Sequence, residues 1–129
     1  MKTGFVNDLG FSQHSHPESP ESAVRLEKLI EFLYKSEVIE SLEKIKIETI
    51  PWDSILDSHT KHYVDKVIKF SKSQKKRISL DTYLTPFASE LARLGASGAV
   101  AATKAVLNGE VQNAFSLMRP VGHHAHSTH

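Results

Sequence analysis

The chain has 129 residues, of which 40% are hydrophobic and 24% are charged, and its formal net charge is +1. This length fits one domain with a modest core, and the balanced charge lacks the basic excess typical of nucleic-acid-binding proteins, so no direct nucleic-acid binding is expected. The chain has no cysteine, which excludes disulfides and thiolate metal sites and favours a cytoplasmic location. No apolar run approaches the roughly 20 residues that span a bilayer, and no secretory leader is expected, so we expect no membrane binding.

The first third of the chain predicts a strand, a polar loop and a long helix. Residues 3–6 are apolar enough for a first strand, and two closely spaced prolines keep the loop after them extended. Apolar residues then recur at helical spacing over residues 26–33. We expect Ser19 to cap this amphipathic helix, which runs to about Glu40 and covers one face of a sheet.

The middle of the chain alternates between strand and helix signals. Apolar and polar residues alternate over 45–50, which is the period of a half-buried strand. A short helical turn is predicted at 52–56, and a second helix begins near Ser58. The loop over 71–77 carries four cationic residues but no aromatic residue that could stack on a base. A solvated loop is the simpler interpretation, and a patch for an acidic partner is the alternative.

The strongest helix signal covers residues 87–107, which are rich in alanine and leucine. Small side chains on one side of this helix, Gly98 and Ala102 among them, allow close approach to a sheet. A third strand follows at 114–118. Strands that alternate with helices predict an α/β fold with a parallel sheet and flanking helices.

Two adjacent histidines follow the third strand. Residues 119–125 read Arg-Pro-Val-Gly-His-His-Ala, and ligands and catalytic groups gather at the carboxyl ends of parallel strands. Histidine is the usual proton-transfer residue near neutral pH. Because adjacent side chains diverge, His123 and His124 fit proton transfer better than joint ligation of one metal ion, and we assign no metal ligand in this chain. A solvated tail or an engineered tag is the alternative.

The same segment resembles the Arg-Pro-Pro-Gly-His-His-Ala signature of zinc-dependent histone deacetylases and acetoin-utilisation-type deacetylases, with Val121 in place of the second proline. This resemblance implies a partial arginase/deacetylase-type three-layer α/β fold, truncated after the tandem-histidine strand. It also implies that His124 is the main base and His123 its electrostatic partner. Zinc is the expected cofactor of the complete domain. In the family its ligands lie downstream of the histidine pair, so we interpret residues 1–129 as the N-terminal portion of the domain.

Three further stretches carry the resemblance. The opening from His16 onward resembles a family motif whose arginine lies at the active-site floor, which implies that role for Arg25; a solvated helix charge is the alternative. Residues 80–86 resemble a loop of class II members that borders the substrate, which implies that Asp81 contacts the bound acyl-lysine; a turn-capping role is the alternative. We also count Gly122 among the substrate-binding residues. His59 and a tyrosine four residues later resemble a family pair for which we expect packing.

The resemblance implies hydrolysis of an acetylated protein, an acetylated polyamine or another small acetyl-amide. Because the family's zinc ligands lie downstream, we expect the isolated chain to be inactive. A truncated parallel sheet leaves an edge and an apolar face uncovered, so we also expect the isolated chain to be marginally stable and aggregation-prone. The alternative is a non-catalytic α/β remnant that acts as a protein-interaction module through a sheet edge or the basic loop. A homo-oligomer is also left open.

Overall fold

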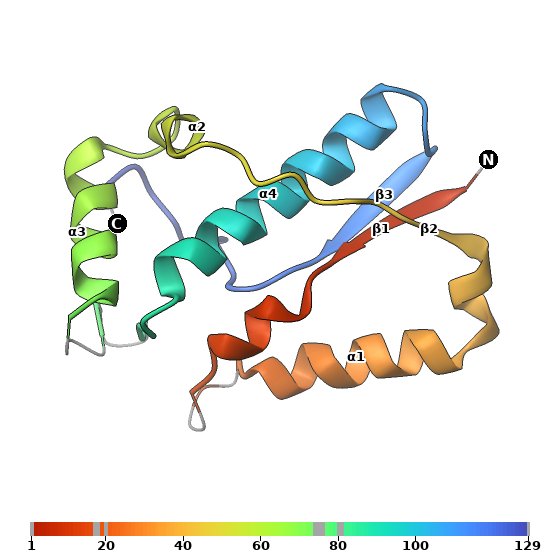
Figure 1. Cartoon of the computed structure of the whole chain (residues 1–129), viewed down its shortest axis with the longest axis horizontal. Helices are drawn as coiled ribbons and strands as arrows, with labels where there is room; N and C mark the ends of the chain where they lie inside the picture. The colour runs from red at the N-terminus through yellow and green to blue at the C-terminus, as the bar shows by residue number, and fades with distance from the viewer. Residues whose placement is uncertain (1, 17–18, 20, 74–76, 80–81, 129) are drawn as a thin grey trace.

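The computed structural model describes residues 2–16, 19, 21–73, 77–79 and 82–128. Within these residues, a three-stranded parallel sheet has the order β2-β1-β3, so the first strand lies in the middle (Figure 1). The strands are β1 (Thr3–Asn7), β2 (Leu42–Lys44) and β3 (Asn113–Leu117). The long crossovers between them carry the helices, as parallel pairing requires.

The central strand is paired over its whole length on one side and over part of it on the other. β1 pairs with β3 from Thr3 opposite Asn113 to Asn7 opposite Leu117. Its pairing with β2 ends after Phe5. Within the described residues the outer edges of β2 and β3 have no strand partner, so they present unpaired backbone groups.

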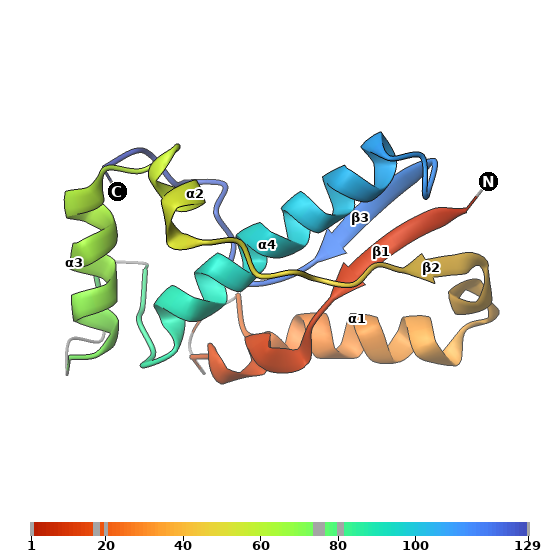
Figure 2. The ribbon, with the colours of Figure 1, turned by 45° about the horizontal axis from the view of Figure 1, so that its top comes forward.

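Helices cover both faces of the sheet. α4 (Ala88–Leu107) packs against Ser116 and Met118, whereas the intervening Leu117 packs against the cluster formed by α1 (Ala23–Lys35) and Phe11. Successive side chains of a strand point to opposite faces, so α1 and α4 lie on opposite sides of the sheet, as the two views agree (Figures 1 and 2). The three layers and the parallel sheet confirm the predicted fold class.

α4 approaches the sheet closely because it carries a glycine at the contact. A Cβ atom built on Gly98 would lie 2.7 Å from Cγ of Met118 and 3.2 Å from Cγ1 of Val6. Such distances leave no room for a side chain. The small residues on this helix therefore serve packing, as the sequence predicted.

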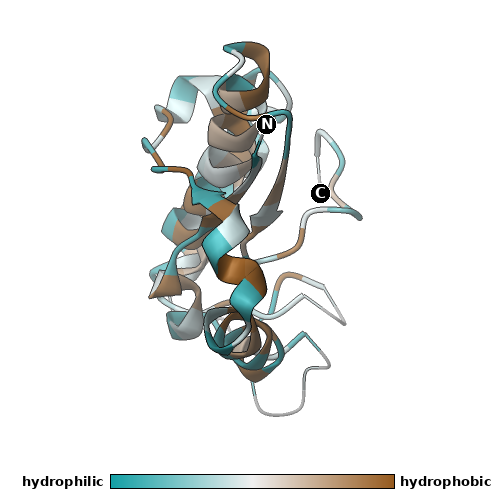
Figure 3. Ribbon diagram, turned by 90° about the vertical axis from the view of Figure 1, so that its right-hand side faces the viewer, coloured by the Kyte–Doolittle hydropathy of each residue, from teal (hydrophilic) through white to brown (hydrophobic). Residues whose placement is uncertain are grey.

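The remaining helices lie away from the sheet. α2 (Trp52–Leu56) leads into α3 (Lys61–Ser71), which stands beyond the N-terminal end of α4 (Figure 1). The Thr60 side chain accepts a hydrogen bond from the Tyr63 amide and so caps α3. Hydrophobic and hydrophilic residues alternate along the helical ribbons, as expected for helices with one buried side (Figure 3). No helix in the described part of the chain is both long and apolar enough to cross a membrane.

The predicted position of the second strand is wrong. The second strand is predicted at 45–50, but β2 ends at Lys44, and the next residues continue as extended chain. The Ile45 amide still donates to Phe5 at 2.8 Å, while the Ile50 amide donates to the Ser97 hydroxyl of α4 at 3.0 Å. The apolar alternation therefore reflects one-sided burial beside α4 and not strand pairing.

The first helix is shorter than predicted. α1 begins after Ser22, and the Ser19 hydroxyl instead accepts from the Glu21 amide at 3.2 Å. At the other end α1 stops at Lys35, and a separate 3-10 helix, η2 (Glu37–Ser41), continues the chain. A second 3-10 helix, η1 (Leu9–Gln13), follows β1 where the sequence predicts a polar loop.

Candidate functional site

The segment that carries the histidine pair leaves β3 at the carboxyl end of the sheet. The Arg119–Pro120 peptide is cis, and the Ala125 amide donates to Gly122 at 2.9 Å, which closes a tight turn. Further along, the Thr60 amide donates to Ser127 at 2.8 Å. The segment therefore crosses from the end of β3 to the N-terminus of α3.

The tight turn holds His123 and His124 side by side. Their ring centroids are 4.2 Å apart with planes at 70°, and both residues are exposed. Exposed imidazoles at a strand end can exchange protons with water or with a bound molecule. The pair thus meets the first geometric requirement of a proton-transfer site.

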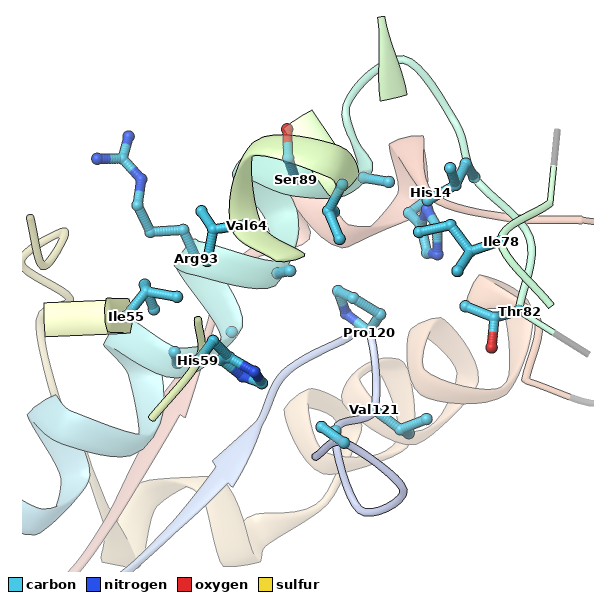
Figure 4. Close-up of a pocket in the computed structure, with 18 of the residues that line it drawn as sticks. His14, Ile55, His59, Val64, Ile78, Thr82, Ser89, Arg93, Pro120 and Val121 are labelled. Atoms are coloured by element: carbon cyan, nitrogen blue, oxygen red, sulfur yellow. The ribbon is translucent and has the colours of Figure 1, made fainter. Parts of the chain in front are cut away.

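A cavity of about 490 Å³ lies beside this segment (Figure 4). Its walls are formed by α2, α3, α4, residues 120–125 and, within the loop over 77–85, residues 78 and 82–84. Its lining is mostly apolar and includes Val64, Val67, Ile78, Leu84, Ala92 and Pro120. Gly122 also lines the cavity, whereas His123 and His124 are not among its described lining residues.

Several polar side chains line the same cavity. The His59 ring lies 5.7 Å from the Tyr63 ring, and its buried Nδ1 has no hydrogen-bond partner among the described residues. Burial raises the pKa of Tyr63. Arg93 stacks over Trp52 at 4.9 Å. In the view of Figure 4, His14 and His59 lie on either side of Pro120. The cavity is therefore apolar with a few polar groups, as ligand sites commonly are.

A buried arginine stands behind one end of the cavity. Arg119 is 3% exposed, and its Nη1 donates to the His14 carbonyl at 2.8 Å while its Nη2 donates to the Tyr83 hydroxyl at 3.3 Å. The His14 ring stacks on the Tyr83 ring at 4.5 Å, and its Nδ1 lies 3.1 Å from Oγ1 of Thr85. Burial, assisted by the Arg119 cation, lowers the pKa of His14 to about 4. His14 is therefore neutral at pH 7.

Only some of the predicted site residues lie at or next to the cavity. Gly122 lies on the cavity, and the histidine pair follows it directly. Arg25 lies on α1 with a side chain 65% exposed, and it pairs with Glu21 at 2.9 Å. That is the position of a solvated helix charge, and the active-site-floor role stays a prediction. Asp81 lies outside the described residues.

Sequence reasoning missed the residues around Arg119. The sequence indicates Arg119 only as part of the signature, and it assigns no role to His14 or Tyr83. The available signal was an arginine directly after a buried strand, because a charge in that position needs internal hydrogen-bond partners.

The described residues do not fit a zinc ion by themselves. None of them form a group of three or more histidine, aspartate or glutamate side chains close enough to hold a metal. A zinc site needs three or four such ligands. Any zinc ion in this protein would therefore depend on ligands outside the described residues.

The sequence matches the family model of the histone deacetylase domain over residues 18–129. It is 34% identical over 131 residues to a probable deacetylase of Archaeoglobus fulgidus, an alignment covering 97% of this chain and 35% of that protein. It is 36% identical over 109 residues to a histone deacetylase-like amidohydrolase of Pseudomonas aeruginosa, covering 84% of this chain and 28% of that one. The crystal structure of the HDA15 HD domain matches with a TM-score of 0.91 at 28% identity, covering 99% of this chain and 38% of that chain. The chain thus spans roughly a third of the length of these relatives.

Proposed function

This chain belongs to the histone deacetylase family, and on that premise we propose that it supplies the histidine-bearing part of a zinc-dependent deacetylase. The observation that carries the proposal is the exposed pair His123 and His124, held in a tight turn at the carboxyl end of β3 beside a cavity. The substrate class is an acetylated protein, an acetylated polyamine or another small acetyl-amide. The names of the relatives, deacetylase and amidohydrolase, support this class.

Amide hydrolysis gives the two histidines distinct tasks. The attacking water must lose a proton, and the leaving amine must gain one. In our proposal His124 accepts the proton from water and returns it to the amine nitrogen, while His123 orients and stabilises the charged ring. The edge-to-face contact of the rings at 4.2 Å supports such a division of labour.

The other proposed site residues act on the substrate. Gly122 has no side chain, so the backbone can come close to a molecule in the cavity that it lines. Asp81 is proposed to hydrogen-bond the substrate backbone, and Arg25 to lie at the active-site floor. Zinc is included in the proposal because of the family to which the chain belongs. The roles given above are those of this chain's own residues.

A second function is favoured by a different observation. The outer edges of β2 and β3 have no strand partner within the described residues, and such edges accept further strands. The chain would then act as a non-catalytic interaction module, or form a homo-oligomer through an edge. The cytoplasmic location stays a prediction under either function.

Acetate release from an acetyl-lysine peptide separates the two functions. The protein isolated from its source cells, with its intact mass measured, is compared with the purified 129-residue chain. We expect chelator-sensitive release by the native protein and none by the isolated chain. Release by the isolated chain would overturn the proposed inactivity, whereas a native protein that releases no acetate from peptide or acetyl-polyamine would favour the interaction module.

A further inference from the structure

Three segments that are far apart in the sequence meet at the Arg119 side chain. One guanidinium nitrogen binds the His14 carbonyl and the other binds the Tyr83 hydroxyl, at 2.8 and 3.3 Å. The same hydroxyl lies 3.4 Å from the His14 carbonyl. Arg119 thus joins the end of β3 to the loop after η1 and to the loop over 77–85.

Side-chain contacts strengthen the join between the two loops. The planes of the His14 and Tyr83 rings are nearly parallel, with 12° between them. The His16 ring lies 5.4 Å from the Tyr83 ring and is tilted by 44° to it. Thr85 contacts the His14 ring through its hydroxyl at 3.1 Å. Within the same loop, the Ile78 amide donates to the Thr82 carbonyl at 2.9 Å, which links the two described parts of the loop, 77–79 and 82–85.

The two joined parts form facing walls of one cavity. The loop contributes Ile78, Thr82 and Leu84, while the segment directly after Arg119 contributes Pro120 and Gly122. Ile78, Thr82 and Pro120 are labelled in Figure 4. Arg119 itself is not among the described lining residues. It therefore acts on the cavity through the elements that it holds.

Burying the Arg119 guanidinium costs free energy, because the cation loses its contact with water. Among the described residues no carboxylate pairs with Arg119, and its Nε has no partner. Within the described part of the chain, its acceptors are one carbonyl and one hydroxyl, both uncharged. Replacing buried charged groups by apolar residues often leaves stability equal or higher, so stability alone does not require this arginine. What the planar guanidinium adds is direction, because it binds two acceptors at a fixed angle.

We propose that Arg119 is a positioning residue that sets the distance between the 77–85 loop and the histidine-bearing segment, and so the fit of the acyl-amide substrate. This inference rests on the proposed deacetylase function. A substrate that contacts this loop while its amide reaches His123 and His124 needs the distance between them to be fixed. Tyr83 shares the role, because its hydroxyl is the acceptor on the loop.

The test compares Arg119→Met, Arg119→Lys and Tyr83→Phe in the native-length protein. We expect Arg119→Met to raise KM for an acetyl-lysine peptide by about tenfold to a hundredfold, with a smaller fall in kcat, since misplaced walls weaken substrate fit. Arg119→Lys should recover part of the loss because lysine reaches one acceptor. In the double variant, Tyr83→Phe should raise KM little beyond the effect of Arg119→Met, because both changes break the same contact.

A matched control and a second readout separate this role from a loss of stability. Lys61→Met removes a surface cation of α3 that pairs with Asp65, and it should leave KM unchanged. Hydrogen exchange should speed up in Arg119→Met over both 77–85 and 119–125, and in neither segment of Lys61→Met.

The outcomes distinguish the positioning role of Arg119 from the proposed deacetylase function. Unchanged exchange, or a KM that does not move in an active protein, overturns the positioning role while the proposed function stands. A wild-type protein that hydrolyses no acetyl-amide overturns the proposed function, and the substrate-fitting role with it.

Discussion

The sheet and the cavity beside its carboxyl end are stabilised by different kinds of contact. In the sheet, Val6 is completely buried, and α4 approaches it so closely that only glycine fits at position 98. Around the cavity, the loops are joined by hydrogen bonds and stacked rings centred on Arg119 and His14. Apolar packing resists any change of volume, whereas polar contacts depend on charge and protonation. The two regions should therefore fail under different perturbations.

The largest expected effect is on turnover and belongs to the cavity region. His124→Ala in the native-length protein should lower kcat by about 10²- to 10⁴-fold, because it removes the proposed general base. Zinc content and the unfolding midpoint should stay unchanged, since the ring is exposed and its ring contact is with the neighbouring His123. His62→Ala, an exposed histidine on α3, is the control. If zinc is lost together with activity, His124 is a ligand and the proton-transfer assignment is wrong.

The second-largest expected effect is a loss of stability in the sheet region. Gly98→Ala should lower the free energy of unfolding by about 1–3 kcal/mol, because the new Cβ would lie 2.7 Å from Cγ of Met118. Gly95→Ala is the matched control on the same helix, since its Cβ would come no closer than 3.5 Å to another atom. That change should be neutral or stabilising by up to about 1 kcal/mol. Urea unfolding of both variants checks the difference, and equal stabilities would contradict the close approach.

The sequence predicts the sheet region better than the cavity region, for a physical reason. The helix predicted at 87–107 and the strand at 114–118 agree with α4 and β3 to within about one residue, because each is a continuous local pattern. β2 was misplaced because alternation reports burial on one side, while pairing is decided by a distant strand. Arg119 could be recognised as part of a signature but not as a link, since its partners His14 and Tyr83 are distant in sequence.

The third effect is a pH dependence that distinguishes the two regions. The pKa of His14 is lowered to about 4 in the folded protein, below its ordinary value of 6.5. Between these values the unfolded chain binds more protons, so His14 makes stability fall as pH drops from 6.5 towards 4. The groups that face its ring are Tyr83 and Thr85, with the Arg119 cation at its backbone carbonyl.

Replacement by a side chain that does not titrate isolates this contribution. The unfolding free energies of wild type and His14→Gln should converge by on the order of 2 kcal/mol as pH falls from 7 to 4.5. Urea titrations at several pH values measure the difference. Parallel curves would mean that His14 is not held neutral, and that the cavity region lacks the predicted sensitivity to protonation.

The smallest expected effect tests how the two regions are joined. Thr60 caps α3 through its side chain, and its amide donates to Ser127, so one residue fixes both the helix and the histidine-bearing segment. Thr60→Ala should cost about 1 kcal/mol of stability, because the Tyr63 amide loses its acceptor, while the backbone contact to Ser127 remains. Thr60→Ser retains the hydroxyl and should cost less. If Thr60→Ala instead speeds hydrogen exchange over 119–125 as strongly as over α3, the cap also supports the segment. The cavity region would then depend on its helix as well as on Arg119.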